Sequence, residues 1–223
     1  MATYVTLHDL TADTSWKKNI STPVNPVLSD DFRAQPDTIS GDLDVINEAS
    51  KEMAGGLVSN NVVPLPASKY FGLDIKVGID AGDFLHLARF ENDLKITLPG
   101  GAQANGSCQW NPDKGIWQLG ANDGAGWVDT DCKYPMSAGD TSLQLRFAFD
   151  GKVWSILGMK VDDNPIYIPP AKFQNLPAAQ TSWTPGIHPQ LQTEVRKAPY
   201  VLQESFHRVR VLESDGPIPY TFD

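Results

Sequence analysis

Hydrophobic and polar positions alternate most regularly between residues 142 and 168. Every second residue from Leu143 to Phe149 is apolar, which predicts a strand with one buried and one exposed side. Asp150-Gly151 then predicts a tight hairpin turn, because glycine tolerates the positive φ that such turns need. A second strand over residues 153–161, a polar turn at 162–165 and a short strand over 166–168 complete a predicted three-stranded meander.

Similar alternation predicts strands elsewhere in the chain. Residues 73–79 form one strand, and residues 84–90 and 94–98 form a pair joined by a turn at Glu91-Asn92-Asp93. Two further strands are predicted over residues 190–196 and 206–212. Residues 99–140 are rich in Gly, Asn, Asp and Trp, and we expect long surface loops there with one strand over 115–119.

The first 61 residues give a weaker pattern. Residues 1–27 are polar and interrupted by Pro23 and Pro26, which predicts an extended arm with an edge strand at residues 4–7. Residues 29–61 allow two interpretations. Leu43, Ile46 and Met53 lie near helical spacing, whereas the rhythm around Leu43 and Val45 fits strands, and we favour strands.

Many short alternating strands separated by turns predict an all-β protein built as an antiparallel two-sheet jelly-roll sandwich. The 18 Gly and 17 Pro residues among 223 agree with many turns and argue against long helices. The expected organisation is an extended N-terminal arm over residues 1–27, one β-sandwich domain over 28–213 and a C-terminal tail over 214–223.

Charge and hydropathy narrow the function classes. The formal net charge of -9 disfavours DNA and anionic membranes as partners, because both would be repelled. No run of eighteen apolar residues exists, so we expect no membrane-spanning segment. Met1 leads into polar sequence without the pattern of a signal peptide, and both a cytoplasmic protein and a secreted one with its signal removed stay open.

The only two cysteines, Cys108 and Cys132, allow two interpretations as well. They form a disulfide across the segment that they bracket, or they are two buried thiols. Two cysteines are too few to assign the redox compartment.

Four short stretches carry a resemblance to a known fold family: residues 28–32 (LSDDF), 55–58 (GGLV), 149–156 (FDGKVWSI) and 206–211 (FHRVRV). Their order and the strand rhythm around them resemble the concanavalin A-like superfamily, including its laminin-G-like modules. The resemblance covers residues 28–213 and rests on strand and turn placement. It is a resemblance of fold and implies a jelly-roll sandwich; the expected function, lectin-like carbohydrate binding, rests on the residues described next.

A Trp-rich stretch offers candidate carbohydrate ligands, because sugar C–H faces stack on indole rings while carboxylates and amides bind hydroxyl groups. The alternative is that these rings cap the sandwich while Asp and Asn shape tight turns. A concave sheet face is a second candidate location for the same function. The candidate ligand-binding residues are Trp110, Trp117, Asn122, Asp123, Trp127, Asp129 and Asp131.

Three carboxylates of this stretch, Asp123, Asp129 and Asp131, also offer oxygen ligands for calcium. Their spacing does not match an EF-hand loop, and acidic turns are common in a chain of this charge. We therefore expect no cofactor, with Ca²⁺ as the alternative.

Enzymatic alternatives are a polysaccharide lyase or a glycoside hydrolase of the same fold. The Glu-x-Asp-x-x-Glu run of the hydrolases is absent. Residues 197–203 (KAPYVLQ) resemble the lyase segment Lys-Ala-Gly-x-Tyr-x-Gln, with its Gly replaced and its Gln displaced. In a lyase a cation steadies the uronate carboxylate while Tyr or His moves the proton, which makes Tyr200, His207 and Arg146 the candidates.

A third alternative is a protein-interaction or assembly module. The long N-terminal arm and the Pro-rich tail would wrap a partner, such as a second copy in a homo-oligomer. The leading expectation is carbohydrate binding without covalent chemistry.

Overall fold

The structure is a computed structural model that describes residues 4–9, 16–20, 27–28, 33–35, 38–45, 53–59, 62–65, 69–121, 126–150, 153–167, 174–175, 179–180, 182–195 and 200–214. Within these residues, strands form two antiparallel sheets of ten and eight strands, and one short helix (α1, Ala81–Phe84) accompanies them. None of the described helices is long and apolar enough to cross a membrane.

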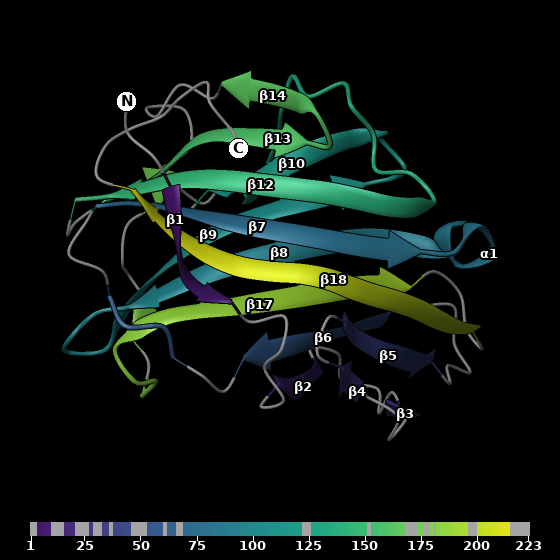
Figure 1. The fold of residues 1–223 in the computed structure, drawn as a ribbon, viewed down its shortest axis with the longest axis horizontal. Helices are drawn as coiled ribbons and strands as arrows, with labels where there is room; N and C mark the ends of the chain where they lie inside the picture. The colour runs from purple at the N-terminus through teal and green to yellow at the C-terminus, as the bar shows by residue number, and fades with distance from the viewer. Residues whose placement is uncertain are drawn as a thin grey trace.

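The larger sheet has the strand order β14-β13-β12-β7-β18-β5-β3, with β1 on β18, β15 on β13 and β4 on β5. Figure 1 shows β12, β7 and β18 at the front of the molecule. The bounds are β1 (Tyr4–Asp9), β3 (Val27–Leu28), β4 (Arg33–Gln35), β5 (Thr38–Val45), β7 (Tyr70–Ile79), β12 (Gly139–Phe149), β13 (Trp154–Val161), β14 (Asn164–Tyr167), β15 (Gln174–Asn175) and β18 (Tyr200–Ser214).

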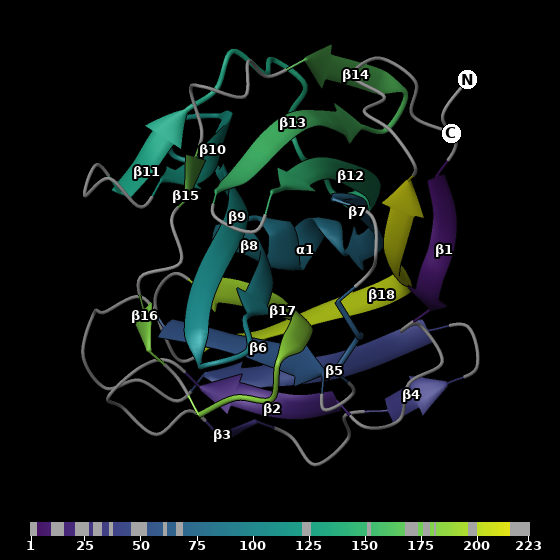
Figure 2. The same cartoon turned by 90° about the vertical axis from the view of Figure 1, so that its left-hand side faces the viewer.

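The smaller sheet has the order β11-β10-β9-β8-β17-β6-β2, with β16 on β9. Figure 2 shows β9, β10 and β11 on the left of the molecule, away from β1 and β18 on the right. The bounds are β2 (Trp16–Ile20), β6 (Met53–Ser59), β8 (Leu87–Thr97), β9 (Ala102–Asn111), β10 (Ile116–Ala121), β11 (Gly126–Asp129), β16 (Ala179–Gln180) and β17 (Gly186–Val195).

The hydrophobic core lies between the sheets and is made by every second residue of the central strands. The pattern is clearest on β7, where five alternate residues are buried: Phe71, Leu73, Ile75, Val77 and Ile79. The smaller sheet contributes the alternate residues Phe90, Leu94 and Ile96 of β8 and the aromatic pair Trp110 and Trp117. This period of two places the other residues of each strand on an outer face.

The predicted all-β sandwich and its central meander are confirmed. β12 and β13 pair antiparallel around the predicted hairpin, with a register shift between Arg146 and Phe147, and β14 returns along β13. The Asp150 carboxylate accepts a hydrogen bond from the backbone N–H of Val153 at 2.8 Å. Strands were also the correct choice for residues 38–45 and 53–59, which form β5 and β6.

Two predictions about β-structure were wrong. The turn predicted at Glu91-Asn92-Asp93 is the middle of β8, one continuous strand that begins after α1. Residues 99–140 are not mainly loops, because they supply β9, β10 and β11 to the smaller sheet. In both places most polar residues fall on the outer face of the sheet, Asn92 being buried in the core instead, so polarity there does not mark a loop.

The segment predicted as an N-terminal arm contributes strands to both sheets. β1 pairs with the C-terminal part of β18, while β2 pairs with β6 of the smaller sheet. β3 pairs with β5 at the edge of the larger sheet.

Candidate functional site

The outer face of the smaller sheet is almost entirely polar, which makes it the candidate site. Register places its side chains in rows that cross the strands. One row runs Glu91, Gln109, Gln118 and Asp129 over β8, β9, β10 and β11. A neighbouring row contains Gln190, Asp93, Ser107 and Trp127. A third contains His188, Lys95 and Asn105.

The centre of this outer face is closed to solvent. Gln109 is 1% exposed and Asp93 is 4% exposed, although both side chains point away from the core. Two rims of this face combine accessible polar groups with a partly exposed indole ring. One rim is formed by β10 and β11, and the other lies beside the first half of β17.

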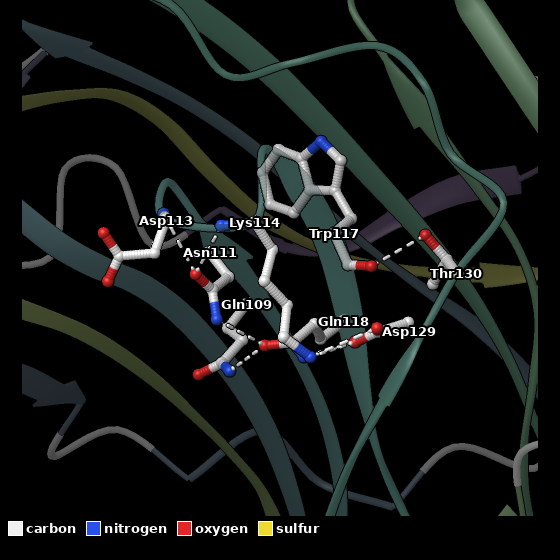
Figure 3. A network of polar contacts seen from close by, with 8 residues as sticks. All are labelled: Gln109, Asn111, Asp113, Lys114, Trp117, Gln118, Asp129 and Thr130. Atoms are coloured by element: carbon white, nitrogen blue, oxygen red, sulfur yellow. Dashed lines mark hydrogen bonds and ion pairs between the residues drawn. The ribbon is translucent and has the colours of Figure 1, made fainter.

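At the β10–β11 rim, a chain of hydrogen bonds fixes the polar side chains (Figure 3). Gln118 is its centre. Its Oε1 atom accepts from Gln109 Nε2 at 2.6 Å and from Asn111 Nδ2 at 3.0 Å, and its amide donates to the Asp129 carboxylate. Lys114 Nζ lies 3.0 Å and 3.1 Å from the two Asp129 oxygens.

Asp129 is exposed and ionised. The hydrogen bond from Gln118 and the contact with Lys114 hold the pKa of its carboxyl below the ordinary range. Asn111 fixes Lys114 as well, because its Oδ1 atom accepts from the backbone N–H of Lys114 at 3.2 Å. An amide, a carboxylate and an ammonium group are thus fixed next to one another at the β10–β11 rim.

Trp127 lies beside this network on β11. It is half-buried, and its ring passes over Gly120, the residue that it pairs with on β10. A Cβ atom at Gly120 would make an ordinary 3.7 Å contact with Trp127 Cζ3 but would lie only 3.0 Å from Ser107 Cβ, so the tight neighbour of this glycine is Ser107.

The second rim contains an exposed aromatic residue that the sequence analysis did not select. Trp183 is 38% exposed and precedes β17. Its ring packs against the His188 ring with a centroid distance of 4.9 Å, and Lys95 Nζ lies 5.8 Å from its centroid. The only sequence signal was a Trp between polar residues just before a strand.

His188 is held neutral at this rim. Burial lowers the pKa of its imidazole, which outweighs the hydrogen bond to the backbone oxygen of Thr184 at 2.8 Å. A neutral imidazole can donate one N–H to that oxygen. His188 therefore supports the Trp183 ring without adding charge.

Asp93 is the most strongly buried carboxyl of the outer face. Burial raises its pKa and outweighs the lowering effect of Lys95, whose Nζ lies 3.8 Å from Asp93 Oδ2. Its Oδ1 atom accepts no hydrogen bond from the residues that the structure describes.

The stability of the Asp93→Asn variant relative to the natural protein is expected to increase as pH rises from about 4 to 7. The raised pKa means that the folded state binds the Asp93 proton more tightly than the unfolded chain does, so stability falls as pH rises through this window. The melting temperatures of both proteins across this range test the sign. Asp129→Asn is the control, because the pKa of Asp129 is lowered: its effect has the opposite sign and falls below about pH 4, so its difference from the natural protein should stay nearly constant across this range. A difference for Asp93→Asn that does not change with pH would contradict the expectation.

The structure divides the predicted ligand-binding residues. It brings Trp127 and Asp129 together at one rim, but Trp110 and Trp117 are 3% and 0% exposed in the core. These two rings lie 5.5 Å apart and have no face open to a sugar, so their predicted place in the binding platform needs correction. The period of two explains this, since both occupy core-facing positions of β9 and β10.

The remaining predicted ligands concern calcium. Asn122 and Asp123 lie outside the described residues, and Asp131 is exposed just after β11. Among the described residues, no group of three or more His, Cys, Asp or Glu side chains is arranged to hold a metal ion.

The predicted lyase residues lie on the larger sheet and are not brought together. Arg146 is 1% exposed, lies over Gly72 and donates to Gln144 Oε1 at 3.2 Å. His207 sits at a β-bulge between Phe206 and Arg208, where its Nε2 atom lies 3.3 Å from Asp140. Arg146 lies opposite Gly72 of β7, and Arg208, the residue after His207, lies opposite Lys76. Arg146 and His207 are therefore separated by roughly 13 Å along the strand. The side chain of Tyr200 is outside the described residues.

Both cysteines are buried free thiols. Burial raises the pKa of Cys132 to about 11 and that of Cys108 further above its usual range. Of the two interpretations of the cysteines, the structure contains the thiol form.

No family model and no curated protein sequence matches the chain significantly. Solved structures do resemble it. Arcelin-5, a lectin-like defense protein from Phaseolus vulgaris, superposes with a TM-score of 0.51 over 96% of this chain and 98% of that chain, at 8% identity. The metal-free carbohydrate recognition domain of Emp46p gives a TM-score of 0.50 over 92% and 94%, at 10% identity. At such low identity the likeness shows the fold, which is the concanavalin A-like jelly-roll sandwich.

Proposed function

We propose that the protein binds carbohydrate at the β10–β11 rim of the smaller sheet. The observation that carries the proposal is the position of Trp127 beside the fixed chain of Gln118, Asp129 and Lys114. A sugar ring offers C–H groups to an indole and hydroxyl groups to amides, carboxylates and ammonium groups, so one ligand can use both halves of the rim.

The fixed network favours binding because its side chains need little further ordering. Gln118 and Asn111 are already oriented by their mutual hydrogen bond, and Lys114 is held against Asp129. An ionised carboxylate has about four acceptor positions, so Asp129 can accept from a sugar hydroxyl in addition to its two protein donors.

Two solved structures with the same fold, a lectin-like protein and a carbohydrate recognition domain, agree with this class of ligand. They support the class only, and the residues of the rim carry the assignment of the site. Covalent chemistry has no comparable support, since His207 and Arg146 lie apart on the other sheet.

Trp127→Ala is expected to lower the affinity for bound glycans by about tenfold or more, because a central aromatic contact is removed. A glycan array followed by titration of the retained glycans measures this loss. Asp129→Asn should lower the affinity for the same glycans while leaving the indole ring of Trp127 in place.

Leu85→Ala is the control, because it shortens an exposed hydrophobic side chain that follows α1 and belongs to neither β10 nor β11. Circular dichroism should show the same fold for all variants. Unchanged glycan retention by folded Trp127→Ala would disprove the site. Release of unsaturated uronates during the incubation would instead assign a lyase.

A further inference from the structure

The rim beside β17 has a different chemistry from the β10–β11 rim. Here an exposed indole, Trp183, lies beside the cation of Lys95, whereas the β10–β11 rim combines its indole with a chain of amides. Lys95 projects from β8 opposite His188 of β17, and Trp183 packs on His188. Three elements of the fold therefore fix the relative position of the ring and the ammonium group.

Within the described residues the ammonium group of Lys95 is only weakly paired, so it can interact with a ligand. Among the described residues its only ion pair is with Asp93, at 3.8 Å, which is beyond hydrogen-bonding distance. Burial raises the pKa of the Asp93 carboxyl and so opposes the ionised form that this pair needs. The cross-strand neighbour of Lys95 on β17 is His188, whose pKa is lowered by burial, so it adds no charge beside Lys95.

Solvent reaches both groups. Trp183 is 38% exposed, and the Lys95 side chain is 21% exposed. A pyranose ring stacked on the indole would place its substituents near an ammonium group that lies 5.8 Å from the centroid of the indole. An anionic substituent gains from that ammonium group, and a hydroxyl group gains less.

We propose that Trp183 and Lys95 form a second saccharide subsite, one that selects sugars carrying an anionic group such as a carboxylate or a sulfate ester. The proposal rests on the proposed carbohydrate binding but uses a different rim. The net charge of -9 repels long polyanions, so the ligand is a short acidic oligosaccharide or an isolated acidic residue within a neutral chain.

The test compares three probes by calorimetric titration of the full chain: tetragalacturonate, its carboxyl-reduced counterpart, and a sulfated form of that counterpart. We expect the natural protein to bind tetragalacturonate about tenfold more tightly than the reduced form. Lys95→Gln should remove this preference, and Lys95→Arg should retain part of it. Trp183→Ala should lower the affinity for all three probes. The sulfated probe shows whether the subsite requires a carboxylate or accepts any anion.

Lys160→Gln is the matched control, since Lys160 lies on the other sheet, is similarly covered and also faces a carboxylate at 3.8 Å, that of Asp163. Equal binding of the acidic and reduced probes, a preference that survives in Lys95→Gln, or no binding of any probe would overturn the proposal. If neutral glycans bind and Trp127→Ala abolishes their binding, the proposed function stands even when no preference for acidic probes is found. An acidic preference that depends on Trp183 but not on Trp127 would support the second subsite, and the Trp127→Ala glycan titration would still decide the first site separately.

Discussion

Replacing Trp117 by alanine is expected to lower the free energy of unfolding by about 3–5 kcal/mol, the usual cost of removing a large buried aromatic side chain. Trp117 is fully buried and packs on Trp110. Its Nε1 atom also donates to the backbone oxygen of Tyr134 at 2.8 Å, and its own carbonyl accepts from Thr130 Oγ1 at 2.8 Å. The substitution leaves a cavity and removes the indole hydrogen bond that holds the chain after β11.

Chemical denaturation measures the effect, with the midpoint compared at an unchanged slope. Trp127→Ala is the paired control, because it removes the same side chain from a half-buried outer position and should cost clearly less. Equal losses for the two variants would mean that Trp117 does not act as a core residue.

Gly186→Ala is expected to destabilise the protein by about 2–5 kcal/mol, from backbone strain and overpacking together. Gly186 has φ of 149°, a conformation that L residues rarely adopt. An added Cβ would lie 2.8 Å from the backbone oxygen of Val63, which accepts from the Ile187 N–H at 2.8 Å. Because the obstacle is backbone, rotation of a side chain cannot relieve it.

Gly82→Ala serves as the control for the added methyl group. Gly82 lies in α1, and a Cβ there would meet no atom within 4 Å. Its melting temperature should stay the same or rise slightly, since alanine restricts the unfolded chain. A Gly186→Ala protein as stable as Gly82→Ala would show that the Val63 segment can move aside.

The sequence was informative wherever one face of a strand is apolar and the other polar. That condition holds for β7 and β12, and the hairpin from β12 to β13 was predicted because Asp150-Gly151 also marks the turn. It fails at Glu91-Asn92-Asp93, where three polar residues in a row resemble a turn. Glu91 and Asp93 face outwards, but Asn92 is fully buried in the core, and its amide has no hydrogen-bond partner among the described residues. Local pattern does not reveal such a buried polar residue.

The candidate site was predictable only in part. Residue type alone cannot separate Trp117 from Trp127, because the difference depends on which side of each strand faces the core. Residues 103–111 alternate polar residues with small or aromatic ones, which is the pattern of a strand. The many Gly and Asn residues nearby favoured a loop instead, so β9 was not predicted. The rim at Trp183 depends on contacts with His188 and Lys95, which lie far apart in the sequence and meet only through the pairing of β8 and β17.

The burial of Cys108 and Cys132 separates the redox chemistry of the native protein from that of the unfolded chain. With the pKa of Cys132 at about 11 and that of Cys108 raised as well, almost no thiolate exists in the folded state at neutral pH. In an unfolded molecule both thiols regain their ordinary reactivity towards alkylating reagents and disulfides. Alkylation at these two positions is therefore a record of how often the sandwich has opened.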